Sequence, residues 1–138
     1  MSVGRSRQRG LSLIELMVVV AILAVLATVG YPLYTQQVLK NRRADAKASL
    51  KSIALAQERY YTANGRYTAS LGSLSIDSDL QTGQTENDYY SLALATANNG
   101  QTFTISASNN AIQADDKCNN YSLDYRGVQS NSGPSNCW

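Results

Sequence analysis

One carboxylate, Glu15, stands inside a long apolar segment. From Leu11 the chain reads LSLIELMVVVAILAVLATVGYPLY, and the next charged residue after Glu15 is Lys40. A run of about 20 apolar residues is long enough for a helix to cross a bilayer, and an ionised side chain there costs a few kcal/mol and usually has a partner or a function. We therefore expect Glu15 to have a partner or a function. The plainer alternative is an interfacial carboxylate at the membrane edge.

The residues just before the apolar segment contain a candidate cleavage site. Arg5, Arg7 and Arg9 form a basic leader, which favours the cytoplasmic side of a membrane. A secretory signal peptide is cut after its apolar run, whereas here Gly10 directly precedes that run. The candidate cut therefore lies before the helix.

The two cysteines, Cys118 and Cys137, are the third chemical feature. Neither belongs to a CxxC pair that would suit zinc or thiol exchange, and both lie near the end of the chain. A structural disulfide is the simplest interpretation, worth about 3 kcal/mol for a loop of this length and stable in an oxidising compartment. The alternative is two free buried thiols.

Composition argues against an enzyme and against strong binding to polyanions. The chain has 12 basic and 10 acidic residues; without the three leader arginines the balance is nine to ten, a net charge of −1. It has no histidine, the commonest general base and metal ligand, and no Gly-rich phosphate loop or nucleophile motif. We expect no catalytic residue, no cofactor and no metal site.

The elements that position these residues begin with one long helix from residue 11 to about 61. Its first half is apolar on all sides, and Gly30 and Pro32 predict a kink near Tyr31. Its second half is amphipathic, so one side should pack on a globular domain. The apolar stripe comprises Leu39, Ala46, Leu50, Ile53 and Tyr60.

A basic cluster decorates the second half of this helix: Lys40, Arg42, Arg43, Lys47 and Lys51. We interpret it as a solvated face with local pairs to residues such as Asp45. A contact with lipid headgroups or DNA is the alternative. These charges also oppose the leader under the positive-inside tendency.

The rest of the chain predicts a small antiparallel sheet. Asn64-Gly65 ends the helix, and residues 65–88 form a loop with at most a short helical turn. Three strands follow in a meander, with a fourth short one as an option, over residues 89–96, 101–108 and 118–126. The expected fold class is α+β, with the long helix covering the sheet.

Gly10 followed by Leu-Ser-Leu-Ile-Glu-Leu resembles the type IV prepilin signature, in which Phe is commoner than Leu11. The turn after the helix and the Cys118 to Cys137 loop are similar to those of PilE-like pilins and the related DNA-uptake minor pilin. The resemblance implies cleavage after Gly10 by a prepilin peptidase, N-methylation of Leu11, and filament assembly through the helix. The Leu11 amine and the Glu15 carboxylate of neighbouring subunits would then neutralise each other.

The same resemblance implies a domain plan and a location. Residues 1–10 would be the leader, 11–34 the transmembrane and filament-core helix, and 35–138 the globular head. The subunit would wait as a single-pass inner-membrane protein with its head in the periplasm, and an assembly platform would move it into an extracellular pilus with other pilins. Such pili serve adhesion, twitching motility or DNA uptake.

Two other functions stay open. A pilin that captures DNA or a surface ligand needs basic residues, yet residues 67–138 hold only Lys117 and Arg126 against seven acidic ones. Arg59 and Arg66, near tyrosines, leave a weak DNA contact as an option. A secretion pseudopilin often has a calcium site, for which the carboxylates are Asp77, Asp79, Asp115 and Asp116; we interpret these as solvated loop acids.

Overall fold

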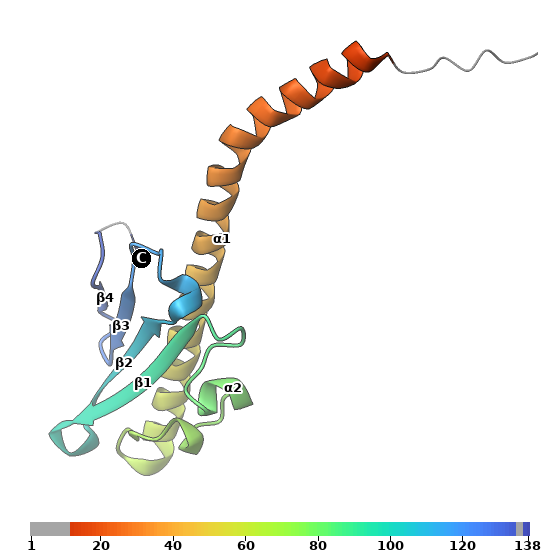
Figure 1. Ribbon diagram of the computed structural model, residues 1–138. Coiled ribbons are helices and arrows are strands. Elements are labelled where there is room, and N and C mark those ends of the chain that lie inside the picture. Colours follow the sequence, from red (N-terminus) through yellow and green to blue (C-terminus); the bar gives the residue numbers. More distant parts are fainter. Residues whose placement is uncertain (1–11, 135–136) are drawn as a thin grey trace, which may run out of the picture. The chain divides into compact units, whose positions relative to one another are not determined.

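The computed structural model describes residues 12–134 and 137–138. The chain divides into two compact units, one up to Gln37 and one from Val38 onward (Figure 1). Helix α1, Leu13–Asn64, contributes its first part to one unit and its second part to the other. Each unit is described by itself below.

The first unit is the apolar part of α1. Its large side chains are exposed, with Leu13, Ile14, Val25 and Leu26 all more than 60% accessible. By length and composition this stretch suits a membrane-spanning helix. The helix continues through Gly30 and Pro32, and the Thr35 hydroxyl donates to the Pro32 carbonyl at 3.0 Å. The predicted kink at these two residues stays a prediction.

The second unit is the head, and the amphipathic part of α1 supplies one wall of its core. Ala46, Leu50 and Ile53 are fully buried, as the apolar stripe predicted. The helix ends at Asn64, and Gly65 follows with φ of +69°, a left-handed conformation that favours glycine. The Gly65 amide donates to the Tyr61 carbonyl at 2.7 Å and closes the last turn.

A four-stranded antiparallel sheet forms the other wall (Figure 1). The strands follow each other in a simple meander, β1–β2–β3–β4, which confirms the three predicted strands and the optional fourth. The strands are β1 Tyr90–Ala97, β2 Thr102–Asn109, β3 Asn120–Asp124 and β4 Gln129–Asn131. Residues Asn98, Asn99 and Gly100 turn the first hairpin, all with positive φ. The inward side chains of β1 to β3 pack with α1 in one hydrophobic core.

The connection between α1 and β1 contains only short turns of helix, as predicted. These are the 3-10 turn η1, Leu71–Ser73, and helix α2, Ser78–Gln81. Leu74 and Leu80 are buried and anchor it to the core. The buried side chain of Gln57 holds the start of this connection with two hydrogen bonds. Gln57 Nε2 donates to the Thr68 carbonyl at 2.6 Å, and Gln57 Oε1 accepts from the Thr68 backbone amide at 3.1 Å. The end of the connection pairs with β1 through a bridge between Gln84 and Ser91.

Candidate functional site

Glu15 lies in the first turn of α1 and is exposed. The Leu16 amide donates to the Ser12 carbonyl at 3.1 Å, so the helix is regular from its start. No cation occurs in the sequence between residues 12 and 39, so a charged partner for Glu15 cannot come from its own apolar helix. The predicted cleavage site Gly10–Leu11 and the predicted methylation of Leu11 lie outside the described residues.

Cys118 and Cys137 form a disulfide with a Cα–Cα distance of 5.6 Å, as predicted. The last residue, Trp138, packs edge-on against Tyr121 at 5.5 Å between ring centroids. Its indole Nε1 donates to the Ser130 carbonyl at 2.7 Å. The disulfide and the indole therefore hold the end of the chain against β3 and β4.

A buried ion pair joins α1 to the segment that leads into this loop. Asp116 is 1% exposed, and both of its oxygens accept from Arg43 Nε at 2.9 Å, while Arg43 Nη2 contacts Oδ1. It also accepts from the Cys118 amide at 3.0 Å, Gln113 Nε2 at 3.1 Å and the Tyr90 hydroxyl at 3.2 Å. Burial alone would raise the pKa of Asp116, but the Arg43 and Cys118 hydrogen bonds hold it below its ordinary value.

The basic cluster on α1 differs from the prediction of a solvated face with local pairs to Asp45. Arg43 pairs with Asp116, which lies 73 residues further along the sequence. Arg42 stacks over the Tyr89 ring, with its Cζ 4.5 Å from the ring centroid. Arg42 Nη1 also donates to the Ile112 carbonyl at 3.2 Å. Both guanidiniums thus contact groups outside α1, in the connection between β2 and β3 and just before β1.

The three lysines of the cluster have other surroundings. Lys40 and Lys51 are exposed. Lys47 is half-buried, with its Nζ 5.7 Å from the Tyr121 ring centroid and 5.8 Å from that of Trp138. Burial, followed by the charges of Arg43 and Lys51, lowers the pKa of Lys47.

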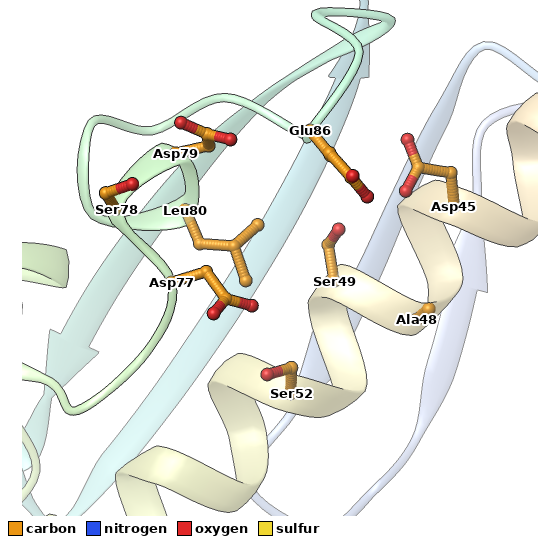
Figure 2. Close-up of a pocket in the computed structure, with 9 residues that line it drawn as sticks. All are labelled: Asp45, Ala48, Ser49, Ser52, Asp77, Ser78, Asp79, Leu80 and Glu86. Atoms are coloured by element: carbon orange, nitrogen blue, oxygen red, sulfur yellow. The ribbon is translucent and has the colours of Figure 1, made fainter.

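A pocket of about 520 Å³ lies between α1, α2 and the end of the connection before β1 (Figure 2). Four of its lining residues are carboxylates: Asp45, Asp77, Asp79 and Glu86. The described residues contain two ion pairs, Arg43–Asp116 and Arg126–Asp124, so none of these four carboxylates has one within the described head. Asp45 Oδ2 is buried and accepts no hydrogen bond there. Burial and the nearby Glu86 charge raise the pKa of Asp45.

The four aspartates considered for calcium do not share a site. Asp77 and Asp79 line the acidic pocket. Asp116 instead forms an ion pair with Arg43, and Asp115 is exposed. Among residues 12–134 and 137–138, no three His, Cys, Asp or Glu side chains are placed to hold a metal ion.

A second pocket, of about 450 Å³, opens at the hairpin end of the head. Its lining residues are Tyr60, Arg66, Tyr67, Thr68, Ala69, Thr96, Asn99 and Gly100, with Arg66 the single charged side chain. The Tyr67 hydroxyl donates to Glu58 Oε1 at 3.0 Å. The Tyr67 ring packs on the rings of Tyr61 and Phe103, with distances between ring centroids of 4.6 Å and 4.7 Å. Burial and Glu58 raise the pKa of Tyr67 to about 12, so its hydroxyl is neutral at neutral pH and donates to the Glu58 carboxylate.

Two of these features escaped the sequence analysis. The sequence analysis assigned Arg43 to a basic cluster and Asp116 to the solvated loop acids. No local pattern in the sequence joins these two residues. The acidic pocket gathers carboxylates from three segments, and no local pattern in the sequence joins them.

Comparison with known proteins gives two family matches. Residues 5–31 match the prokaryotic N-terminal methylation motif, and residues 32–122 match the model for "Type IV minor pilin ComP, DNA uptake sequence receptor". The type IV major pilin protein PilA of Myxococcus xanthus is 37% identical over 62 residues, covering 45% of this chain and 28% of that protein. The chain thus spans less than a third of that curated relative.

Two solved structures are similar over 72% of the chain. A type IV pilin from Shewanella oneidensis has 32% sequence identity and a TM-score of 0.53, with 72% of this chain and 97% of that chain covered. The non-core minor pilin PilV of Neisseria meningitidis has 21% sequence identity and a TM-score of 0.53, with 72% of this chain and 91% of that chain covered. At this identity the similarity shows a shared fold alone.

Proposed function

Since the chain belongs to the ComP family of type IV minor pilins, we propose that it is a subunit of a type IV pilus. Before assembly the apolar part of α1 holds it in the inner membrane as a single pass, with the head in the periplasm. After assembly the head is exposed on an extracellular filament. The observation that carries this proposal is Glu15, a carboxylate on an exposed apolar helix that has no ion pair among the described residues.

The proposed route begins with a prepilin peptidase that cuts between Gly10 and Leu11, followed by N-methylation of Leu11. The new amino group and Glu15 are then opposite charges on the same apolar helix. When an assembly platform packs such helices together, the Leu11 amine of one subunit pairs with Glu15 of its neighbour. An ion pair in these surroundings is expensive to break, because the remaining charge stays buried without a partner.

We test the pairing with Glu15→Ala and wild-type chains produced in the same cell. Membrane insertion and cleavage of both forms are checked first, and each form is then counted in sheared filaments. Loss of the pair should lower incorporation of the variant by at least tenfold, since about 1.4 kcal/mol already corresponds to that factor.

Met17→Ala is the matched control, because it truncates a side chain in the same apolar segment without removing a charge. We expect it to be incorporated nearly as well as wild type. Equal incorporation of Glu15→Ala and Met17→Ala would refute the pairing role, and absence of the wild-type chain from filaments would refute the proposed function.

The family description favours a second function for this chain, capture of DNA. The pocket at the hairpin end supports it, because Arg66 is exposed, is not paired with a described carboxylate and lies beside tyrosine rings that suit base stacking. Arg59 is also exposed. By contrast Arg126 pairs with Asp124, with Nη2 3.1 Å from Oδ2, which reduces its value for phosphate binding.

Fluorescence anisotropy with labelled duplex DNA and the detergent-solubilised full chain measures this contact. Arg66→Ala should weaken binding and reduce the slope of log K against log salt by about one phosphate contact. Lys117→Ala removes an exposed charge elsewhere and should change neither value. The same affinity and salt slope for both variants would exclude the hairpin end as the DNA site.

A further inference from the structure

The 3-10 turn η3, Ala111–Gln113, and the residues after it bury polar side chains and expose apolar ones. Ile112 is 60% exposed, and Ala114 is exposed as well. Gln113 and Asp116, by contrast, are 0% and 1% exposed. Buried polar residues are uncommon in a water-facing loop, so the outer side of this turn suits apolar surroundings.

Hydrogen bonds fix η3 on α1. Gln113 Nε2 donates to the Leu39 carbonyl at 3.4 Å and to Asp116 Oδ2 at 3.1 Å. Arg42 Nη1 donates to the Ile112 carbonyl at 3.2 Å. The exposed Ile112 side chain is therefore carried by a turn that is tied to the first residues of the head.

This part of α1 follows closely on the end of the apolar segment. Tyr31 and Tyr34 stand at that end, and tyrosines there are typical of the headgroup level of a membrane. Leu39 comes five residues after Tyr34, about 7.5 Å further along a helix. Each headgroup layer is about 5 to 8 Å thick, so Leu39 and the turn tied to it would lie at the outer edge of that layer.

The charged side chains next to η3 do not favour one sign. Lys40 and Lys117 are exposed cations, and Asp88 and Asp115 are exposed anions. Asn110, the residue before η3, donates from Nδ2 to the Asp88 carbonyl at 2.6 Å, which places Asp88 beside the turn. Exposed apolar surface, rather than charge, therefore distinguishes this side of the head.

From these observations we propose that η3 is a second contact of the chain with the bilayer, in which Ile112 inserts among the headgroups of the membrane that holds its own α1. The inference rests on the proposed function, because it concerns the stage at which the apolar part of α1 spans the membrane. A single isoleucine would bind a bilayer weakly from solution. Here α1 keeps η3 beside the surface, so the contact forms within one molecule and fixes which side of the head faces the membrane.

Quenching of a fluorophore by labelled lipid measures this insertion. The full chain with Ile112→Cys is labelled with a nitrobenzoxadiazole maleimide and reconstituted at low density into phosphatidylcholine vesicles that contain lipid with a nitroxide on its headgroup. The native cysteines form the disulfide and do not react. Leu55→Cys is the matched control, because Leu55 is 54% exposed but lies 16 residues, about 24 Å, beyond Leu39 on α1. We expect quenching at residue 112 to be several-fold greater than at residue 55.

Equal quenching at the two positions would overturn the proposal. A blue-shifted emission at residue 112 without lipid quenching would place Ile112 against a second copy instead of lipid, and would overturn it too. Flotation of the same vesicles separates this failure from failure of the proposed function. A chain that does not float refutes the membrane stage and this inference with it, whereas a floating chain without quenching at residue 112 contradicts the inference alone.

A second measurement leaves residue 112 unlabelled. With the label on Ala111→Cys, also an exposed position, the added change Ile112→Asp should lower quenching several-fold, whereas Ile112→Leu should keep it. Leu55→Asp should have no effect. Replacing part of the phosphatidylcholine by phosphatidylglycerol should leave these results unchanged, because the charges next to η3 are mixed. Quenching that requires the anionic lipid, or that persists with Ile112→Asp, would overturn the role of Ile112.

Discussion

Among single residues, Asp116 has the most demanding environment in the head. It is buried, and its charge is compensated by Arg43 and by three further donors from Cys118, Gln113 and Tyr90. Removing one partner of a buried ion pair typically costs about 3 to 5 kcal/mol, because the other charge is left uncompensated. We therefore expect Asp116→Asn to lower the free energy of unfolding by an amount of this order, measured by denaturant unfolding of the detergent-solubilised chain.

The same residue predicts a pH dependence. Because the pKa of Asp116 is lower in the folded head than its ordinary value of 3.8, its stabilisation is present above that value and is lost as the pH falls through the folded pKa. The gap between wild type and Asp116→Asn should narrow below about pH 4. Asp115→Asn, the exposed neighbour, should follow the wild-type curve, and a gap that stays constant down to pH 2 would contradict this account.

At the level of elements, we expect the Cys118–Cys137 disulfide to hold the C-terminal loop against β3 and β4. The loop is rich in Gly, Ser and Asn and has little apolar surface of its own. Cys118→Ser or Cys137→Ser should each lower the free energy of unfolding by about 2 to 4 kcal/mol.

Reductant provides the control for the disulfide prediction. It should destabilise wild type by a similar amount and leave both serine variants unchanged. Trp138 fluorescence follows the loop directly, since the indole packs on Tyr121 in the intact protein. Two alkylatable thiols in unreduced wild-type protein would contradict the prediction.

At the scale of the whole molecule, the proposed cleavage would make Leu11 the first residue of the filament subunit. We expect the intact mass of the chain from sheared filaments to equal residues 11–138 with one added methyl group and one disulfide. A bulky residue should not fit a peptidase site shaped for glycine, so Gly10→Leu should accumulate at full length in membranes. Residues 1–10 retained on filament protein would refute the processing step.

The sequence by itself determined the features that depend on one segment at a time. The apolar run with Glu15, the end of α1 at Gly65 and the alternation along the strands are local, because the helical and strand periods reveal which side is buried. The disulfide was also predictable, since the chain has two cysteines.

Only the tertiary structure decided which charges meet. Arg43 pairs with Asp116, 73 residues away, and Asp45 lines one pocket together with Asp77, Asp79 and Glu86. The physical reason is that a side chain takes the acceptor or donor that folding of the 65–88 connection and of the C-terminal loop brings to it. The spacing of residues along α1 does not predict where those loops lie in the folded structure.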